Sequence, residues 1–240
     1  MIKLPVSGMN NQPRVVINTG GSIIAPDQLD GAFLRQMADL LVKVTGTYDL
    51  LVVVGGGRIA RRYIEACREL GADENYLDWV GIDATRLNAR LLISALPEKV
   101  HRDVPSTVDD ALKASLEYPI VVMGGTHPGH TTDTVSAMLA ERSKAKELLI
   151  LTNVDGVYTT DPRKDPDAER LPRITTSQLV DIVSEGQYRA GSTAVVDPVA
   201  AGIIHRAGIL TKVMDGRDLD QVSAALAGDD FVGTIVAPGD

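Results

Sequence analysis

The sequence LLVVVGGGRIA, residues 50–60, joins an unbroken apolar run to three glycines and then to the start of a helical pattern. An apolar run without alternating polar residues is typical of a strand that is covered on both faces of a sheet. Glycines directly after such a strand allow positive φ angles and let a ligand approach the backbone closely. The stretch therefore predicts a buried strand, a ligand-binding turn and a helix in succession.

The same succession of strand, turn and helix recurs along the chain. The expected strands are 15–18, 50–54, 119–123, 147–151 and 209–213. The expected helices are 29–44, 58–70, 74–96, 132–142 and 193–207. Strands that alternate with helices of this length predict an α/β fold, a three-layer αβα sandwich with a mainly parallel central sheet.

The domain organisation follows from the same pattern. We interpret residues 14–240 as one domain, which is long enough to bury a large core. Residues 1–13 are interpreted as a loosely docked N-terminal extension. The proline-containing stretch 159–173 is interpreted as a solvated loop, with a soft boundary between an earlier and a later part of the domain near Tyr158.

The composition excludes several classes of protein. The 240 residues carry a net charge of −8, whereas the surface of a nucleic-acid-binding protein is normally basic. Cys67 is the single cysteine, so no intramolecular disulfide requires an oxidising compartment. No apolar run reaches the roughly 20 residues that span a bilayer, and the first residues do not form a signal peptide. We expect a soluble, cytoplasmic protein that binds neither a nucleic acid polymer nor a membrane.

Two more glycine clusters follow expected strands, Gly20-Gly21 and Gly124-Gly125. Parallel strands end at one edge of the sheet, where glycine turns that open into helices present free N–H groups to anions. A single such turn would be read as a simple chain reversal, but three favour a polyanionic ligand. No Walker-type sequence G-x-x-x-x-G-K-[ST] is present. Residues 55–60 match the dinucleotide pattern G-x-G-x-x-G/A, but no acidic residue ends the next strand, so an NAD(P)-dependent oxidoreductase ranks last.

Basic side chains follow the second glycine cluster. Arg58 and Arg61 share a helix face and would provide a local positive field beside an anion site. Arg62 has an alternative reading as a solvated side chain that pairs with glutamates of its own helix. Arg86 and Arg90 also share a helix face and are read as substrate contacts, subunit contacts or surface ion pairs.

The third glycine cluster leads into a polar loop. His127 and His130 lie on either side of a Pro-Gly turn with no cysteine nearby, so we expect loop geometry and hydrogen bonding rather than structural zinc. A second polar run, residues 152–158, ends the strand 147–151 and is able to hydrogen-bond a base, a ribose or hydrated Mg²⁺. A plain Asp-Gly turn would explain residues 155–156 of this run but not the rest.

Four segments together resemble the amino acid kinase superfamily. They are residues 20–22, residues 55–57, residues 126–133 (THPGHTTD) and residues 152–158 (TNVDGVY) with Asp161-Pro162. Within the superfamily, the stretch 126–132 and residues 85–89 (TRLNA) resemble the archaeal type of UMP kinases. The resemblance runs from about residue 14 to residue 238.

This resemblance implies the transfer of the γ-phosphoryl group of ATP to UMP with the help of Mg²⁺, no residue being assigned as a direct metal ligand. It implies that ATP is bound by Gly21, Ser22, Gly57, Arg61, Thr152, Asn153, Tyr158 and Asp161. It implies that UMP is bound by Gly56, Asp78, Thr126, His127, Pro128, Gly129, His130, Thr131 and Thr132. The part of the chain up to about residue 150 would favour UMP and the later part ATP, and relatives of this type are usually homohexamers.

The chemistry of phosphoryl transfer assigns catalytic roles to Arg61 and Asp133. Arg61 would neutralise the developing charge, and Asp133 would organise Mg²⁺ or the basic groups around the transferred phosphoryl. The alternative for Asp133 is an ordinary carboxylate in the first turn of a helix.

One departure from the family pattern concerns Asn18, where many members carry a lysine. Another arginine, Lys164 or a second metal ion would have to replace that cation, or catalysis would be weak. Two other readings therefore stay open. One is a sister kinase for an acylamino acid or isopentenyl phosphate, and the other is a non-catalytic nucleotide-binding or storage protein.

Overall fold

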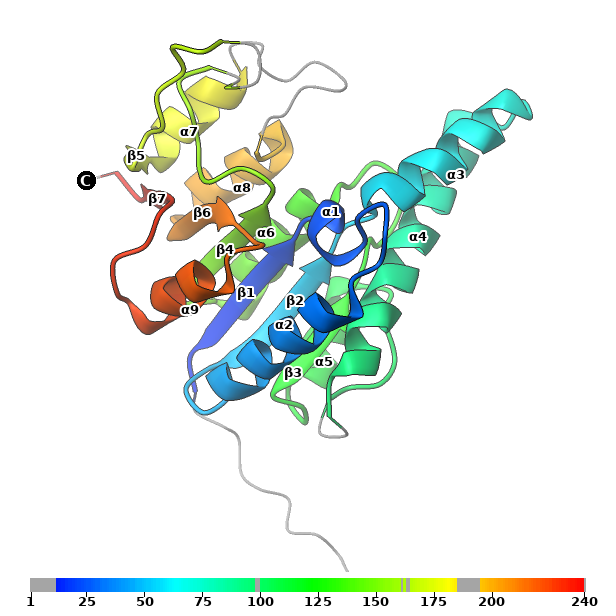
Figure 1. The fold of residues 1–240 in the computed structure, drawn as a ribbon, viewed down its shortest axis with the longest axis horizontal. Helices are drawn as coiled ribbons and strands as arrows, with labels where there is room; N and C mark the ends of the chain where they lie inside the picture. Colours follow the sequence, from blue (N-terminus) through cyan, green and yellow to red (C-terminus); the bar gives the residue numbers. More distant parts are fainter. Residues whose placement is uncertain (1–11, 98–99, 161, 163–164, 185–194, 240) are drawn as a thin grey trace, which may run out of the picture.

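The central sheet sets the position of every loop discussed below. The structure is a computed structural model that describes residues 12–97, 100–160, 162, 165–184 and 195–239. The strands of this part are β1 (Arg14–Thr19), β2 (Asp49–Val54), β3 (Ile120–Met123), β4 (Glu147–Thr152), β5 (Arg173–Thr175), β6 (Thr211–Asp215) and β7 (Thr234–Ala237). They form one sheet in the order β3-β2-β1-β4-β6-β7-β5 (Figure 1). Neighbouring strands are parallel except β6 and β7, which are antiparallel.

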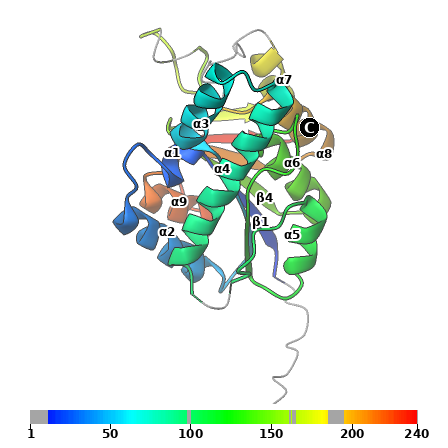
Figure 2. The same cartoon turned by 90° about the vertical axis from the view of Figure 1, so that its right-hand side faces the viewer.

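Helices cover both faces of this sheet. They are α1 (Gly21–Ile24), α2 (Gly31–Val44), α3 (Gly57–Glu69), α4 (Glu74–Ala95), α5 (Val108–Ala114), α6 (Thr132–Ser143), α7 (Thr176–Ile182), α8 (Pro198–Ala207) and α9 (Leu219–Ala227). One hydrophobic core joins the sheet to α2, α4 and α9, and a second joins it to α5, α6, α7 and α8. Figure 2 shows α2 and α9 on one side of the strands and α5, α6 and α8 on the other. The predicted α/β fold with a mainly parallel sheet is confirmed.

Burial on both faces explains why the strands contain no alternating polar residues. In β1, Val15 and Ile17 point into the first core, while Val16 points into the second. All six residues of β2 are buried. A strand in this position needs apolar side chains on both of its sides, so its sequence reads as a continuous apolar run.

Several predicted boundaries are accurate, because β1 to β4, α2, α3, α4 and α6 begin and end within two residues of the expected ranges. The strand expected at 209–213 is wrong by two residues. Gly208 ends α8 in the left-handed conformation, and Ile209 donates its N–H back to the carbonyl of Ile204. The chain therefore joins the sheet only at Thr211.

The helix expected at 193–207 also begins later than predicted. Asp197 caps α8 by accepting hydrogen bonds from the N–H groups of Val199 and Ala200, and Pro198 occupies the first turn. A proline in the first turn fits because its missing N–H has no partner in the helix there. The first residues of the expected range, 193–194, lie outside the described residues.

The elements missing from the sequence interpretation are short. They are β5, β7, α1, α5, α7 and α9. Three or four residues are too few to show a hydrophobic period, and α1, α5, α7 and α9 span between four and nine residues. The expected loop 159–173 is closed by a bridge between Tyr158 and Arg170.

Two further expectations concern the N-terminal extension and the absence of a membrane-spanning helix. The expected extension 1–13 lies mostly outside the described residues, although the carbonyl of Pro13 accepts a hydrogen bond from the N–H of Asp49. Among the helices of the described part, none has the length and apolar character that a membrane crossing would need.

Candidate functional site

Two adjoining clefts open where the parallel strands end. The larger has a volume of about 910 Å³ and is lined by the turns after β1, β2, β4 and β6 and by the start of α6. The smaller has a volume of about 420 Å³ and is lined by α3, α4 and the loop that leads to α6. Gly56, Gly57 and Thr132 line both clefts. The three glycine clusters therefore converge on one region, as parallel strands dictate.

The turns after β1 and β2 are packed backbone against backbone. A Cβ atom on Gly21 would lie 1.9 Å from the amide nitrogen of Gly57, and Gly57 itself has a φ of +64°. No side chain fits between atoms at that separation, so glycine is required at Gly21 by space and is favoured at Gly57 by conformation. Figure 1 shows the result, in which α1 and the first turn of α3 meet at the end of the sheet.

The first turn of α3 faces the larger cleft without a side-chain cap. Its N-cap residue is Gly56, so no side chain accepts hydrogen bonds from the first N–H groups. Such a helix end carries a partial positive charge and is suited to bind an anion. Arg58 and Arg61 line the cleft beside it.

An acidic side chain binds Arg58 and also Arg62, which follows on the same helix. Asp27 also lines the larger cleft, and its carboxylate is 2.5 Å from Arg58 Nη1 and 3.0 Å from Arg62 Nη2. The alternative reading of Arg62 is therefore wrong about its partner, which is Asp27 rather than a glutamate of its own helix, although the side chain is exposed to solvent as that reading has it. Both ion pairs are exposed to solvent and contribute little to stability.

Asn18 and Asp133 meet in the larger cleft. Asn18 Nδ2 donates a 2.7 Å hydrogen bond to Asp133 Oδ1, while Asn18 Oδ1 is buried with no hydrogen-bond partner among the described residues. The pKa of Asp133 is raised to about 6: burial is the main cause and the negative charge of Asp197 adds to it, while the hydrogen bond from Asn18 opposes the shift. Among the described residues, therefore, no cation lies close enough to lower the pKa of this carboxylate.

The oxygens of this pair fit a hydrated Mg²⁺ ion. Magnesium prefers hard oxygen ligands and keeps several of its waters, so one carboxylate and one amide oxygen are a suitable partial shell. The unpartnered Oδ1 of Asn18 and the uncompensated Asp133 both line the larger cleft. Among the described residues, no group of three or more His, Cys, Asp or Glu side chains gathers to hold a metal ion by itself.

The smaller cleft has a histidine-rich wall. Asp78 accepts a 3.1 Å hydrogen bond from the N–H of Gly129, which has a φ of +86°, and this bond joins α4 to the loop. The rings of His127 and His130 lie 4.1 Å apart. Burial lowers the pKa of His130, the nearby His127 lowers it further, and Asp197 opposes the shift.

Asp197 links this wall to the later part of the chain. Its carboxylate accepts a 2.5 Å hydrogen bond from Thr131 Oγ1 and bonds from Thr134 Oγ1 at 3.0 and 3.1 Å. Thr131 in turn caps α6 by accepting from the N–H of Thr134. Sequence reasoning missed Asp197, although an Asp-Pro pair before an apolar helical pattern is a helix-start signal.

The predicted site residues fall into three groups. Gly21, Ser22, Gly57, Arg61, Thr152, Asn153 and Asp133 line the larger cleft, and Gly56, Asp78, His127, Pro128, Gly129, His130, Thr131 and Thr132 line the smaller one. Thr126 and Tyr158 are not among the described residues that line either cleft. Tyr158 donates its hydroxyl to Asp155 at 2.7 Å, while Thr126 is held through its carbonyl. Asp161 and Lys164 lie outside the described residues.

Two charged side chains among the described lining residues were not anticipated from the sequence, Asp27 and Arg217. Asp27 follows α1 in a stretch with no motif, so nothing in the sequence pointed to it. Arg217 follows Gly216 at the end of β6 and lines the larger cleft. The strand-then-glycine argument used for the other turns would have identified Arg217 had the end of that strand been placed correctly.

The fold and the paired clefts define a class of protein: an α/β protein with two adjoining clefts at the carboxyl edge of a mainly parallel sheet, the larger beside an uncapped helix N-terminus and two arginines. Residues 13–215 match the model of the "Amino acid kinase family". The chain belongs to the amino acid kinase family.

Known proteins are similar to this chain in sequence and in fold over nearly its whole length. A protein of Thermococcus onnurineus named "Uridylate kinase" is 44% identical over 94% of this chain and 100% of the relative. The crystal structure of uridylate kinase from Archaeoglobus fulgidus is 44% identical, covers 93% of this chain and 100% of that chain, and superimposes with a TM-score of 0.85. The UMP kinase structure from Bacillus anthracis is 21% identical with a TM-score of 0.77, and shares the fold.

Proposed function

We propose that this protein is a UMP kinase that transfers the γ-phosphoryl group of ATP to UMP, giving ADP and UDP in pyrimidine nucleotide biosynthesis. The observation that carries the proposal is the pair of clefts that meet at Gly56, Gly57 and Thr132. A donor phosphate in one and an acceptor phosphate in the other would face each other across the shared glycine backbone. The similarity to uridylate kinases over 94% of the chain supports UMP as the acceptor.

The larger cleft suits ATP and the smaller suits UMP. The described lining of the smaller cleft comes entirely from residues 56–132. The larger takes most of its lining from residues 18–61 and 132–133, but it alone includes later residues, namely 150–154, Val195 and Arg217. This distribution supports a domain whose part before about residue 150 favours the acceptor and whose later part favours the donor. Asp78 reaches the loop of the smaller cleft, in keeping with a place near the acceptor.

The reaction needs positioning and charge neutralisation rather than covalent chemistry. Phosphoryl transfer proceeds when two anionic groups are held in line and the developing negative charge is stabilised. In this proposal the uncapped N–H groups of α3 and the guanidinium of Arg61 bind phosphate oxygens, which is supported by the start of α3 and Arg61 both lining the larger cleft. Mg²⁺, when bound with ATP, would supply further charge neutralisation, and Asp133 with Asn18 Oδ1 would hold its hydration shell.

The test is a coupled assay that follows ADP formation with ATP, Mg²⁺ and a series of acceptors. We expect turnover with UMP to exceed that with CMP, acylamino acids and isopentenyl phosphate. Turnover with one of the other acceptors and none with UMP would identify a sister kinase instead. ATP binding in calorimetry without turnover of any acceptor would identify a nucleotide-binding or storage protein. That alternative arises because Asn18 stands where many family members carry a lysine.

Thr131 provides a test of the acceptor cleft. Its hydroxyl lines the smaller cleft and is shared with Asp197 and the first turn of α6. Thr131→Ala should raise the KM for UMP more than the KM for ATP, because the larger cleft does not include this residue among its described lining. Thr45→Ala, at the end of α2 and away from both clefts, is the control. Equal changes in both KM values would place Thr131 outside the acceptor site.

We further propose that the protein forms a homo-oligomer, with a hexamer expected from the resemblance. Large apolar side chains of α3 and α4 and the turn between them are exposed: Tyr63, Leu70, Tyr76, Trp79 and Leu87. Such a cluster on one pair of helices is typical of a protein–protein contact.

The single cysteine, which requires no oxidising compartment, supports a cytoplasmic location.

Sedimentation velocity tests this assembly. Leu70 is 87% exposed at the end of α3, and Leu116, after α5, is 70% exposed. Leu70→Glu should shift the sedimentation coefficient toward that of a 25.6 kDa monomer, because it places a charge in the contact. Leu116→Glu should leave the coefficient unchanged. A wild-type protein that sediments as a monomer at micromolar concentration would overturn the proposal.

A further inference from the structure

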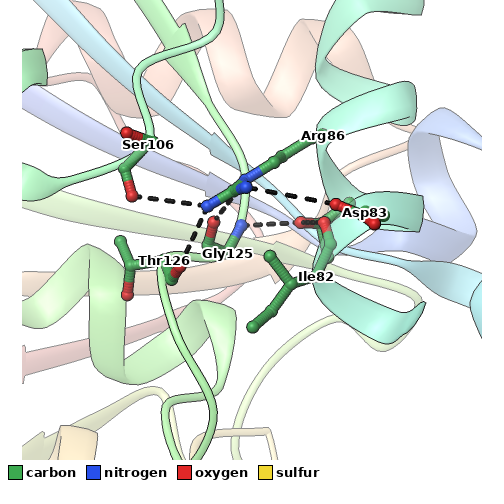
Figure 3. A network of polar contacts seen from close by, with 7 residues as sticks. Ile82, Asp83, Arg86, Ser106, Gly125 and Thr126 are labelled. Atoms are coloured by element: carbon green, nitrogen blue, oxygen red, sulfur yellow. Dashed lines mark hydrogen bonds and ion pairs between the residues drawn. The ribbon is translucent and has the colours of Figure 1, made fainter. Parts of the chain in front are cut away.

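Arg86 lies behind the loop of the smaller cleft and binds its backbone. Arg86 Nε donates to the carbonyl of Gly125 at 3.2 Å, and Nη2 donates to the carbonyl of Thr126 at 2.9 Å (Figure 3). Nη2 also reaches the carbonyl of Ser106 at 3.5 Å. A planar guanidinium with five N–H donors can bind several carbonyls at once, which the ammonium group of lysine cannot do in the same geometry.

Thr85 holds the same loop from the neighbouring position on α4. Its Oγ1 accepts a 2.6 Å hydrogen bond from the N–H of Gly125 and donates to the carbonyl of Ile82 at 2.6 Å. Both backbone groups of Gly125 are therefore bound to α4. A Cβ atom on Gly124 would lie 2.5 Å from Thr85 Oγ1, so loop and helix are in direct contact.

Asn88 holds the second glycine turn from the same helix. Its Nδ2 donates to the carbonyls of Gly55 and Gly56 at 2.9 and 3.1 Å, and the residue is 2% exposed. Gly56 lines both clefts, whereas the loop held by Arg86 lines only the smaller one. Residues 85–88 of α4 thus bind two loops: the loop at Gly125, which lines the smaller cleft, and the turn at Gly56, which lines both clefts.

We infer that Arg86 is a positioning residue for the acceptor and Asn88 is a positioning residue for both substrates. The inference rests on the proposed function, because it names the cleft in which UMP is bound. Arg86 has a side chain that is 25% exposed and faces Asp83 at 4.0 Å, so its charge is directed mainly at backbone carbonyls. It acts on the acceptor through the loop that starts at Gly125, and it does not belong to the described lining of either cleft.

The kinetic experiment compares Arg86→Met, Arg86→Lys and Asn88→Ala with the wild type. Misplacing a substrate-binding loop costs up to about 100-fold, so we expect Arg86→Met to raise the KM for UMP at least about tenfold. The KM for ATP should change less than about twofold, since the donor cleft keeps its lining. Asn88→Ala should raise both KM values. Arg90→Met is the control, because Arg90 is exposed one turn further along α4.

Chemical rescue separates positioning from a general loss of packing. Guanidinium ion at low millimolar concentration should restore part of the UMP affinity of Arg86→Ala, measured by calorimetry, and should not change that of Asn88→Ala. Arg86→Lys should remain impaired, because it keeps the charge but not the arrangement of donors. If Arg86→Met binds UMP as tightly as the wild type, or if both KM values rise equally, the inference is overturned.

Hydrogen exchange of the unliganded protein tests the positioning without substrate. Arg86→Met, or Arg86→Lys if the first variant does not fold, should speed amide exchange in residues 125–130 and leave residues 20–24 unchanged. Unchanged exchange in 125–130 would overturn the inference even if UMP is a substrate. A wild-type protein that neither binds nor phosphorylates UMP would overturn the proposed function alone, while the exchange result would still decide the role of Arg86.

Discussion

Asp133 is the residue whose ionisation is most informative about the chemistry. Its pKa is raised to about 6 by burial and by the charge of Asp197, so the carboxylate is lost as the pH falls through that value. If the ionised form organises the cation, kcat/KM should rise with pH to about 6 and level off above it. A pH profile of the wild type checks this, and Asp133→Asn should lower kcat at least about tenfold with little change in UMP binding.

The same pKa makes a prediction about stability. An unfolded aspartate has a pKa near 3.8, so the folded state holds this proton more tightly than the unfolded state does. Ionisation of Asp133 therefore costs stability as the pH rises from about 4 to about 6. Asp133→Asn should melt at a higher temperature than the unliganded wild type at pH 7, with the difference shrinking toward pH 4. A melting-temperature difference between Asp133→Asn and the wild type that stays the same from pH 4 to pH 7 would contradict this assignment.

At the scale of elements, the contact between the turns after β1 and β2 tolerates substitution least, because it leaves no room for a side chain at Gly21. A Cβ on Gly21 would overlap the backbone of Gly57, and no rotation of a side chain relieves that contact. Gly21→Ala should therefore destabilise the protein by about 1–3 kcal/mol or more and abolish nucleotide binding. Urea unfolding and calorimetry measure the two effects.

The control for that variant lies in a helix with open space. Gly202 is inside α8, and outside its own helix no atom of the described residues lies within 4 Å of the position that a Cβ atom would take there. Gly202→Ala should therefore stabilise the protein by up to about 1 kcal/mol, since alanine favours the helix more than glycine does. If Gly21→Ala were as stable as this control, the turns would have to separate in solution.

The bounds of helices and strands could be predicted from the sequence where neighbouring residues alone signal where an element begins or ends. The apolar run 50–54 and the glycines after it were sufficient for β2 and the start of α3. The start of α8 was misplaced although the Asp197-Pro198 pair is a local start signal, because that signal was overlooked. What no local signal shows is that the Asp197 carboxylate also binds Thr131 and Thr134. The short strands β5 and β7 depend on each other for hydrogen bonds although they lie far apart in the chain, and a three-residue run carries no period of its own.

At the scale of the whole molecule, a net charge of −8 coexists with a region suited to anions. The parallel sheet brings the uncapped end of α3, Arg61 and Arg217 to one edge, where local groups outweigh the overall charge. The two clefts lie side by side there because strands β1, β2 and β3 are neighbours in the sheet and their turns are adjacent.

The sequence by itself determined the fold class and the carboxyl-edge location of the glycine turns, because apolar runs, glycines and helix starts act over a few neighbouring residues. The residues assigned to the two clefts came instead from the resemblance to a known family. Only the tertiary structure decided which distant groups meet. Asn18 and Asp133 are 115 residues apart in the chain, and Thr131 and Asp197 are 66 apart. The binding of two glycine turns by Arg86 and Asn88 was equally inaccessible. Such contacts depend on the order of the strands and on how each helix crosses the sheet, which no local pattern records.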